Sequence, residues 1–260
     1  MDPEQPAYNA CTTLPRRAAR YDCCLRVPRP FEKPDLAIYS QYEELLAGRE
    51  PSWDNPDIWT HALRPFALLR ETTVRVYNRS PSVSAVNALV HLRLFPFGIG
   101  TTASVVATRR ISLAAGASST LRFPLEESVL AGDPRIGVTV DIEHPQDAQP
   151  INNSGSQAVD VAFTSDEGRS QILEIPVVNN ATESREIRLE IIATDLNVSV
   201  APALRVFASG ETGRVALSIQ VPPALHGSAS SAVERRVTVV GRGPDGSLIG
   251  GVTRILEIDD

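Results

Sequence analysis

Val74-Arg75-Val76-Tyr77-Asn78-Arg79-Ser80 decides the fold prediction for this chain. Its side chains alternate and then stop at a turn cluster around Asn78, which is typical of a strand that ends in a tight turn. A second strand candidate, Ala88–Phe95, follows this turn. The same order recurs 101 positions later, where Ile175–Ala181 precedes Ile187–Ala193. That period matches the length of one immunoglobulin-like domain, so the repeat predicts two like domains, with chance similarity between hairpins as the alternative.

The other strand candidates are short and are separated by Gly, Pro and Asn. Within Ala88–Phe95 we expect Ala88, Val90, Leu92 and Leu94 to face a core, and Leu89, His91, Arg93 and Phe95 to face solvent. Residues 40–50 have room for one helical turn before Pro51. The remaining candidates are 35–39, 72–77, 103–110, 119–123, 136–142, 158–163, 170–178, 198–200, 215–221, 235–240 and 253–258.

The pattern lacks the interleaved helices of 10–15 residues that a parallel α/β sheet needs. We therefore predict an all-β chain of two tandem immunoglobulin-like antiparallel β-sandwiches with an extended N-terminal arm. The expected divisions are 1–34 for a Pro-rich arm, 35–157 for the first sandwich and 158–260 for the second. Ser154-Gly155-Ser156 is expected to mark the boundary between the sandwiches.

Composition excludes several classes of function. The 260 residues carry a net charge of −6, which argues against a nucleic-acid binder, since such proteins present a basic face. No apolar run approaches the length of a membrane span. The N-terminus has no basic and apolar signal segment, so we expect a cytoplasmic protein, or one assembled there and released with a particle.

The arm holds the three cysteines and six of the twenty prolines. An odd cysteine count without an export signal does not indicate a disulfide framework, and Cys11, Cys23 and Cys24 lack the four ligands of a closed zinc site. Pro28-Arg29-Pro30 favours an extended backbone. The arm is therefore either disordered or laid along a partner, and Pro28, Arg29 and Pro30 are candidate interaction residues.

Part of the first folded region resembles a known family. Trp53 with Pro56-Asp57-Ile58-Trp59, the strand and turn of Thr73–Ser80, and Asp141-Ile142-Glu143-His144 followed by Asn152-Asn153 are similar to the bacterial cell-adhesion-related domain, CARDB, over about residues 54–157. Ser80 stands where that family usually has glycine. The resemblance implies a non-catalytic sandwich of surface, adhesive and assembly proteins, whose last strand is Asp141–His144 and whose exit is Asn152-Asn153.

A search for chemistry in the sequence finds no site. His61, His91, His144 and His226 are widely spaced and form no local ligand pair, so no metal or cofactor is expected. Acidic residues near 141–147 and at Asp259-Asp260 raise the possibility of calcium, but a solvated edge is the simpler interpretation. We expect no catalytic residue.

Trp53 and Trp59 are the only tryptophans. Either could anchor a partner, because Trp is enriched at interface hot spots, or could pack over the core beneath a loop.

The sequence therefore predicts a non-enzymatic structural or interaction protein. The first possibility is a subunit or decoration of a larger bacterial assembly, such as a phage-tail-like or contractile particle or a surface assembly, with protein partners or copies of itself. The alternative is an accessory module that recognises a protein or glycan beside a separate hydrolase.

Overall fold

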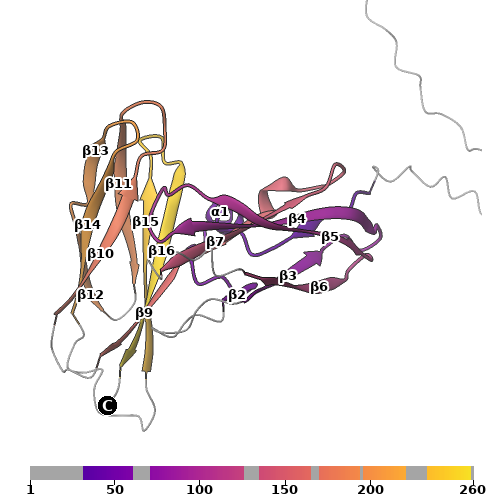
Figure 1. Ribbon diagram of the computed structural model, residues 1–260, viewed down its shortest axis with the longest axis horizontal. Coiled ribbons are helices and arrows are strands. Elements are labelled where there is room, and N and C mark those ends of the chain that lie inside the picture. The colour runs from indigo at the N-terminus through magenta and orange to yellow at the C-terminus, as the bar shows by residue number, and fades with distance from the viewer. Residues whose placement is uncertain are drawn as a thin grey trace, which may run out of the picture. The chain divides into compact units, whose positions relative to one another are not determined.

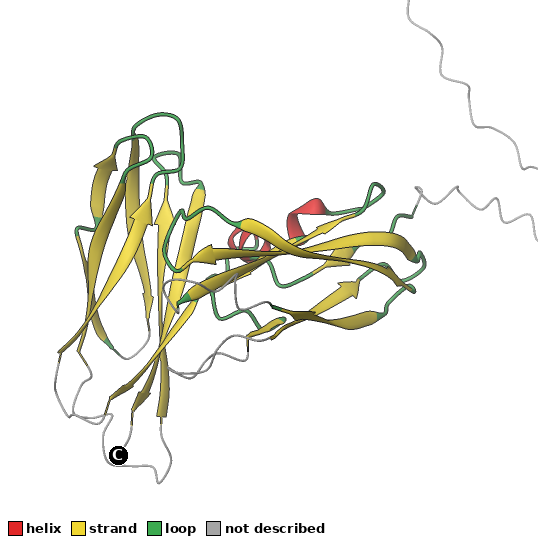
Figure 2. Ribbon diagram, viewed as in Figure 1, coloured by secondary structure: helices red, strands yellow, loops and turns green. Residues whose placement is uncertain are grey.

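The structure is a computed structural model that describes residues 32–60, 71–125, 135–164, 170–193, 196–220 and 233–258. Residues Glu32–Asp260 form one compact unit. In the described ranges almost all regular structure is β, with two short helical segments (Figure 2). No helix in these ranges is long and apolar enough to cross a membrane.

The first sandwich is built from two sheets that share one core. In one sheet β3 pairs with β6 on one side and with β1 and β2 on the other; the second sheet has the order β5-β4-β7-β8 (Figure 1). Its elements are β1 (Leu36–Ala37), α1 (Gln41–Leu46), β2 (Ile58–Thr60), β3 (Glu71–Asn78), β4 (Ala85–Pro96), β5 (Ser104–Leu113), β6 (Ser118–Pro124), β7 (Ile136–Glu143), the 3-10 helix η2 (Pro150–Asn152) and β8 (Ser154–Gln157).

Alternation along β4 explains how this core forms. Every second side chain of a strand points to the same face, and Ala88, Val90, Leu92 and Leu94 are all buried there, as predicted. The prediction that Phe95 faces solvent is wrong. Its side chain is only 8% exposed, because residues of the second sandwich cover that end of the strand.

The second sandwich likewise has two sheets around one core. Their orders are β10-β14-β12 and β13-β11-β15-β16-β9, and the antiparallel pairs form an immunoglobulin-like sandwich. The strands are β9 (Val159–Thr164), β10 (Ser170–Val178), β11 (Arg185–Ala193), β12 (Asn197–Ala201), β13 (Leu204–Phe207), β14 (Thr212–Gln220), β15 (Val233–Arg242) and β16 (Leu248–Ile258).

One strand pair departs from the antiparallel prediction. β9 runs parallel to β16, with Asp160 opposite Arg254. Their side chains form an ion pair in which both are largely buried. Burial lowers the pKa of Arg254, and the nearby Asp160 carboxylate opposes that change. The entering strand is therefore fixed to the last strand of its sandwich and not to β10.

The predicted repeat is confirmed at the level of individual hydrogen bonds. Asn78 ends β3 and its buried amide nitrogen donates to the carbonyls of Val83, Leu113 and Ala114. Asn179 follows β10, and its buried amide nitrogen donates to three carbonyls in the same relative places, those of Glu183, Phe207 and Ala208. Each amide oxygen also accepts a backbone N–H two residues later in the chain. One buried asparagine thus ties three chain segments together in each sandwich.

Three strands were missing from the sequence prediction, namely β2, β8 and β13. β8 includes Ser154-Gly155-Ser156, so the expected boundary there is wrong: these residues pair with β7 at the edge of a sheet. For the same reason Asp141–His144 is not the last strand of the first sandwich, and Asn152-Asn153 leads into β8. All three missed strands are only three or four residues long.

We predict that Asn179→Ala lowers the free energy of unfolding by at least about 2 kcal/mol, because it leaves three buried carbonyls without their donor. Asn78→Ala is expected to cost a similar amount. Asn180→Ala is the matched control: that side chain is exposed, and its loss should change stability by less than about 0.5 kcal/mol. Urea unfolding followed by circular dichroism measures all three. Equal stability of the Asn179 and Asn180 variants would contradict the role given to Asn179.

Candidate interaction site

The loop between β4 and β5 reaches into the second sandwich. The Ile99 N–H donates to the Pro176 carbonyl and the Ile99 carbonyl accepts from the Val178 N–H, both at 2.9 Å. Ile99 thereby forms a parallel bridge opposite Val177 of β10, and its side chain is 0% exposed within the second core. From the sequence alone, Gly98-Ile99-Gly100 lies between two strand candidates and is expected to be a hairpin loop, so its second role was missed.

Glycines on both sides of Ile99 make this close approach possible. A Cβ atom on Gly98 would lie 2.7 Å from the Pro176 carbonyl oxygen, and one on Gly100 would overlap the Val178 carbonyl. Both glycines have positive φ, which other residues adopt at a cost. The signal in the sequence was Gly98-Ile99-Gly100 itself, an apolar residue held between two glycines.

Trp53 is the second contact between the sandwiches. Its side chain is 3% exposed and belongs to the core cluster of the second sandwich. The indole lies where a Cβ on Gly251 would be, so only glycine fits beneath it. The Trp53 N–H donates to the Thr253 hydroxyl at 3.0 Å, and the Trp53 carbonyl accepts from the Ala158 N–H at 2.9 Å. The structure thus gives Trp53 the packing role.

A cavity of about 110 Å³ lies beside these contacts. Its walls include Trp53 and Phe95, several glycines, and Thr139 and Ser156, whose hydroxyls are 2.9 Å apart. None of the described residues that line it carries a carboxylate, an imidazole or a thiol. It therefore offers no nucleophile with an adjacent base.

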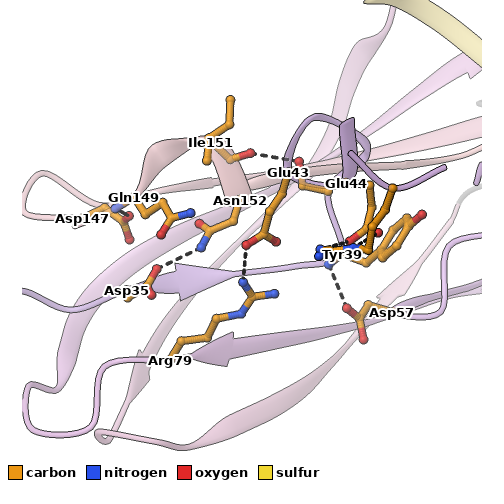
Figure 3. A network of polar contacts seen from close by, with 12 residues as sticks. Asp35, Tyr39, Glu43, Glu44, Asp57, Arg79, Asp147, Gln149, Ile151 and Asn152 are labelled. Carbon is orange, nitrogen blue, oxygen red and sulfur yellow. Dashed lines mark hydrogen bonds and ion pairs between the residues drawn. The ribbon is translucent and has the colours of Figure 1, made fainter. Parts of the chain in front are cut away.

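A network of polar contacts fixes the segment before β2 (Figure 3). The buried Asp57 carboxylate accepts the Tyr39 N–H and the Tyr77 hydroxyl, both at 2.8 Å. The Asn152 amide donates to Asp35 at 3.0 Å, and Arg79 donates to Glu43 at 2.7 Å.

The segment after β7 belongs to the same network. Asp147 accepts the N–H groups of Leu36 and Gln149, both at 2.8 Å. The Ser40 hydroxyl donates to the Ile151 carbonyl at 2.9 Å. These bonds satisfy backbone groups that a short, irregular entry segment would otherwise leave unpaired, so the cluster is structural.

Two tyrosines of this network have shifted pKa values. Burial raises the pKa of the Tyr39 hydroxyl, which accepts the Ser52 N–H. Burial also raises the pKa of Tyr77, and its hydrogen bond to the Asp57 carboxylate adds to the effect, because an anionic phenolate would face an anion. Because both pKa values are raised, both tyrosine hydroxyls stay protonated and keep their hydrogen bonds at neutral pH.

The two described histidines each contact a neighbouring segment of the first sandwich. His91 contacts the Thr108 hydroxyl at 2.9 Å and lies 3.5 Å from Glu143. His144 contacts the Val86 carbonyl at 3.2 Å. Both side chains interact across neighbouring strands or turns.

The carboxylates that raised the possibility of calcium point to different partners. Asp141 contacts Arg93 and accepts the Ser154 hydroxyl, both at 2.7 Å, whereas Asp147 binds backbone N–H groups. No group of three or more His, Cys, Asp or Glu suited to a metal occurs in the described ranges.

Several sequence candidates lie outside the described residues. These are Cys11, Cys23, Cys24, Pro28, Arg29, Pro30, His61, His226, Asp259 and Asp260.

Trp59 and several aliphatic side chains remain exposed. Trp59 is 41% exposed on β2, opposite Thr73 of β3. Exposed aliphatics also lie on strands at sheet edges: Val105 on β5, Ile172 on β10, and Leu204 and Val206 on β13. Such edges are surfaces on which another chain can pair.

Comparisons with known proteins give limited similarity. No family model matches the sequence, and no curated protein matches it. Escherichia coli alpha-2-macroglobulin activated by porcine elastase is 12% identical over 88% of this chain and 22% of that chain, with a TM-score of 0.30.

In two further solved structures, the match with this chain extends over most of the other chain's length. The CupB6 tip adhesin from Pseudomonas aeruginosa is 9% identical over 77% of this chain and 93% of that chain, at a TM-score of 0.25. The Vibrio cholerae VesB protease is 10% identical over 88% and 89%, at 0.29. At these TM-scores none of the three indicates a function for this chain.

We predict that Trp53→Ala lowers the free energy of unfolding by about 3–5 kcal/mol, the usual cost of emptying a buried aromatic site. Trp59→Ala is the control within the same chain and should cost much less, since Trp59 is exposed. Denaturant unfolding monitored by far-ultraviolet circular dichroism compares them. Similar losses for both variants would show that Trp53 is not a structural anchor.

Alkaline pH is predicted to destabilise the fold through Tyr39 and Tyr77. Their folded pKa values lie above the unfolded value of about 10, so the stabilisation is complete below that pH and is lost as pH rises through the folded values. Tyr77→Phe should therefore flatten the loss of stability above about pH 10. Unfolding titrations across this range, with Tyr42→Phe as an exposed control, measure the slope. An unchanged slope in the Tyr77 variant would contradict this assignment.

Proposed function

We propose that this chain is a non-catalytic structural protein, a subunit or decoration of a larger bacterial assembly, in which the two sandwiches act as one continuous unit. The observation that carries the proposal is the position of Ile99, a residue of the first sandwich that completes the core and a sheet of the second. A chain of freely hinged modules would keep its linkers outside both cores, since loops normally run over the surface.

Two features support a structural role over a catalytic one. The buried polar side chains Asn78, Asn179 and Asp57 each make two or more hydrogen bonds within the chain, and they fix turns or the entry segment. The cavity at the junction is small and lacks acid–base groups among its described lining. The polar chemistry of the described residues is thus used to hold the chain in place.

The CARDB-like interpretation of residues 54–157 belongs to the same proposal. Its support is the Thr73–Ser80 motif, which forms the end of β3 and the turn held by Asn78. A domain of that kind would serve as an interaction module in a surface or particle assembly. Protein partners, including other copies of this chain, follow from the exposed edge strands.

Ile99→Asp is the test. A carboxylate among the apolar residues of the second core is costly, so we expect the wild type to unfold in one thermal transition and the variant in two. We also expect the wild type to sediment in a large assembly in extracts of its source organism, and the variant to be absent from that assembly. Calorimetry and velocity sedimentation provide these two measurements.

Leu46→Asp is the control for both measurements, because Leu46 is highly exposed at the end of α1. It should melt and sediment like the wild type. A wild-type protein that sediments as a 28.1 kDa monomer in every extract would overturn the assembly proposal. Loss of an enzymatic activity on substitution of His91 by Ala, with the fold intact, would overturn the non-catalytic proposal.

A further inference from the structure

The internal repeat exposes a difference between two equivalent sheet edges. In the first sandwich the edge of β3 is covered at both ends: β1 pairs with Tyr77 and Asn78, and β2 pairs with residues 72–74. In the second sandwich Ile99 occupies the equivalent of the β1 position, beside Val177 of β10. Among the described residues, no strand occupies the equivalent of the β2 position, beside residues 173–175.

The backbone of β10 is oriented to accept a strand there. The Pro176 carbonyl and the Val178 N–H both point to this edge, since Ile99 binds them. Backbone groups alternate along a strand, so those of Ile172 and Glu174 point to the same edge. Ile172 is also 70% exposed, on the outer face of the sheet. The edge therefore combines backbone groups that no other described residue is seen to bind with an exposed apolar side chain.

β2 shows which side chains suit such a position. Ile58 is buried opposite Val74, while Trp59 points outward opposite Thr73. By equivalence, a strand on β10 needs an apolar residue opposite Ile175 and an outward residue opposite Glu174. β2 has Thr60 at its third position, opposite Thr72, but the equivalent residue in β10 is the buried Leu173, so an apolar residue fits opposite it. Glu174 is an exposed carboxylate whose contact with Arg214 uses one oxygen, so a basic residue fits opposite it.

The chain itself contains an apolar–basic–apolar triplet of this kind outside the described residues, Leu25-Arg26-Val27. Pro28 follows directly, and its missing N–H would end a ladder at that point. Comparable triplets such as Val74-Arg75-Val76 and Leu92-Arg93-Leu94 already lie within strands of the described sheets.

We infer that Leu25-Arg26-Val27 of a second copy of this chain pairs antiparallel with β10, with Leu25 opposite Ile175, Arg26 opposite Glu174 and Val27 opposite Leu173. The inference rests on the proposed structural function and names the partner as the protein itself. Pairing of this type adds main-chain hydrogen bonds for affinity and side-chain matches for register. Mutual exchange gives a closed dimer, and one-way exchange gives a growing chain of copies.

Charge reversal tests the register. Glu174→Arg and Arg26→Glu, each made in the full-length chain, place like charges opposite one another and should weaken self-association by about tenfold or more. The double variant Glu174→Arg with Arg26→Glu restores the opposite charges and should associate like the wild type. Glu183→Arg is the matched control on an exposed turn beside β10 and should leave association unchanged. Sedimentation equilibrium gives the association constants, and circular dichroism confirms the fold of each variant.

Mixing the two single variants separates exchange between copies from pairing within one chain. In the mixture, the acidic segment of the Arg26→Glu copy meets the basic edge of the Glu174→Arg copy, so association should reappear only on mixing. Hydrogen exchange should show the Ile172 and Glu174 amides protected in the wild type, and the amides at both positions open in each single variant. Protected amides in a wild-type monomer would mean pairing within one chain, and would overturn the inference.

Other outcomes separate this inference from the proposed function. If the wild type self-associates but neither single variant weakens it, the pairing is wrong while the structural role stands. If the purified wild type stays monomeric and its Ile172 and Glu174 amides exchange freely, the pairing is also overturned. In that case the structural role is tested separately, by sedimentation of source-organism extracts. A large assembly that contains the protein would support that role, and a monomer in every extract would overturn it.

Discussion

The contact on which the described fold most depends is the backbone pairing of Ile99 with β10. Two hydrogen bonds and a fully buried side chain join a loop of one sandwich to the sheet and core of the other. Since separate cores normally permit domain motion, this insertion removes the freedom that a short linker would give. Trp53 adds to the same effect from the other direction, because its indole covers Gly251 and its backbone binds Thr253 and Ala158.

The internal repeat explains why two sandwiches of little sequence similarity have the same form. Asn78 and Asn179 each replace a set of turn hydrogen bonds with one buried amide that binds three carbonyls. Buried polar groups of this kind are costly unless fully bonded, so they specify one arrangement of the neighbouring strands. A single residue type at one position can therefore define the turn, while the core around it varies.

Sequence reasoning predicted the long strands because their alternation is a local property. It predicted the core face of β4 down to Ala88, Val90, Leu92 and Leu94. It missed β2, β8 and β13, because these short segments form strands by pairing with distant strands and not through a pattern of their own. It also left Trp53 between two roles and treated Gly98-Ile99-Gly100 as a turn. Both depend on which surface of the other sandwich lies opposite, and no local pattern encodes that.

The edge of β3 is covered by two strands, whereas the edge of β10 is not. The route by which the chain enters each sandwich accounts for this difference. In the first sandwich the entering residues form β1 and β2 and pair with β3, held by the Asp57 and Asp35 hydrogen bonds. In the second, Ala158 is bound to Trp53 and Thr253 at the junction, so the next residues lie beside β16 and form β9 in the opposite sheet. The buried Arg254–Asp160 pair holds β9 there. The same junction that joins the sandwiches thus directs the entering strand away from β10, and among the described residues Ile99 alone covers part of that edge.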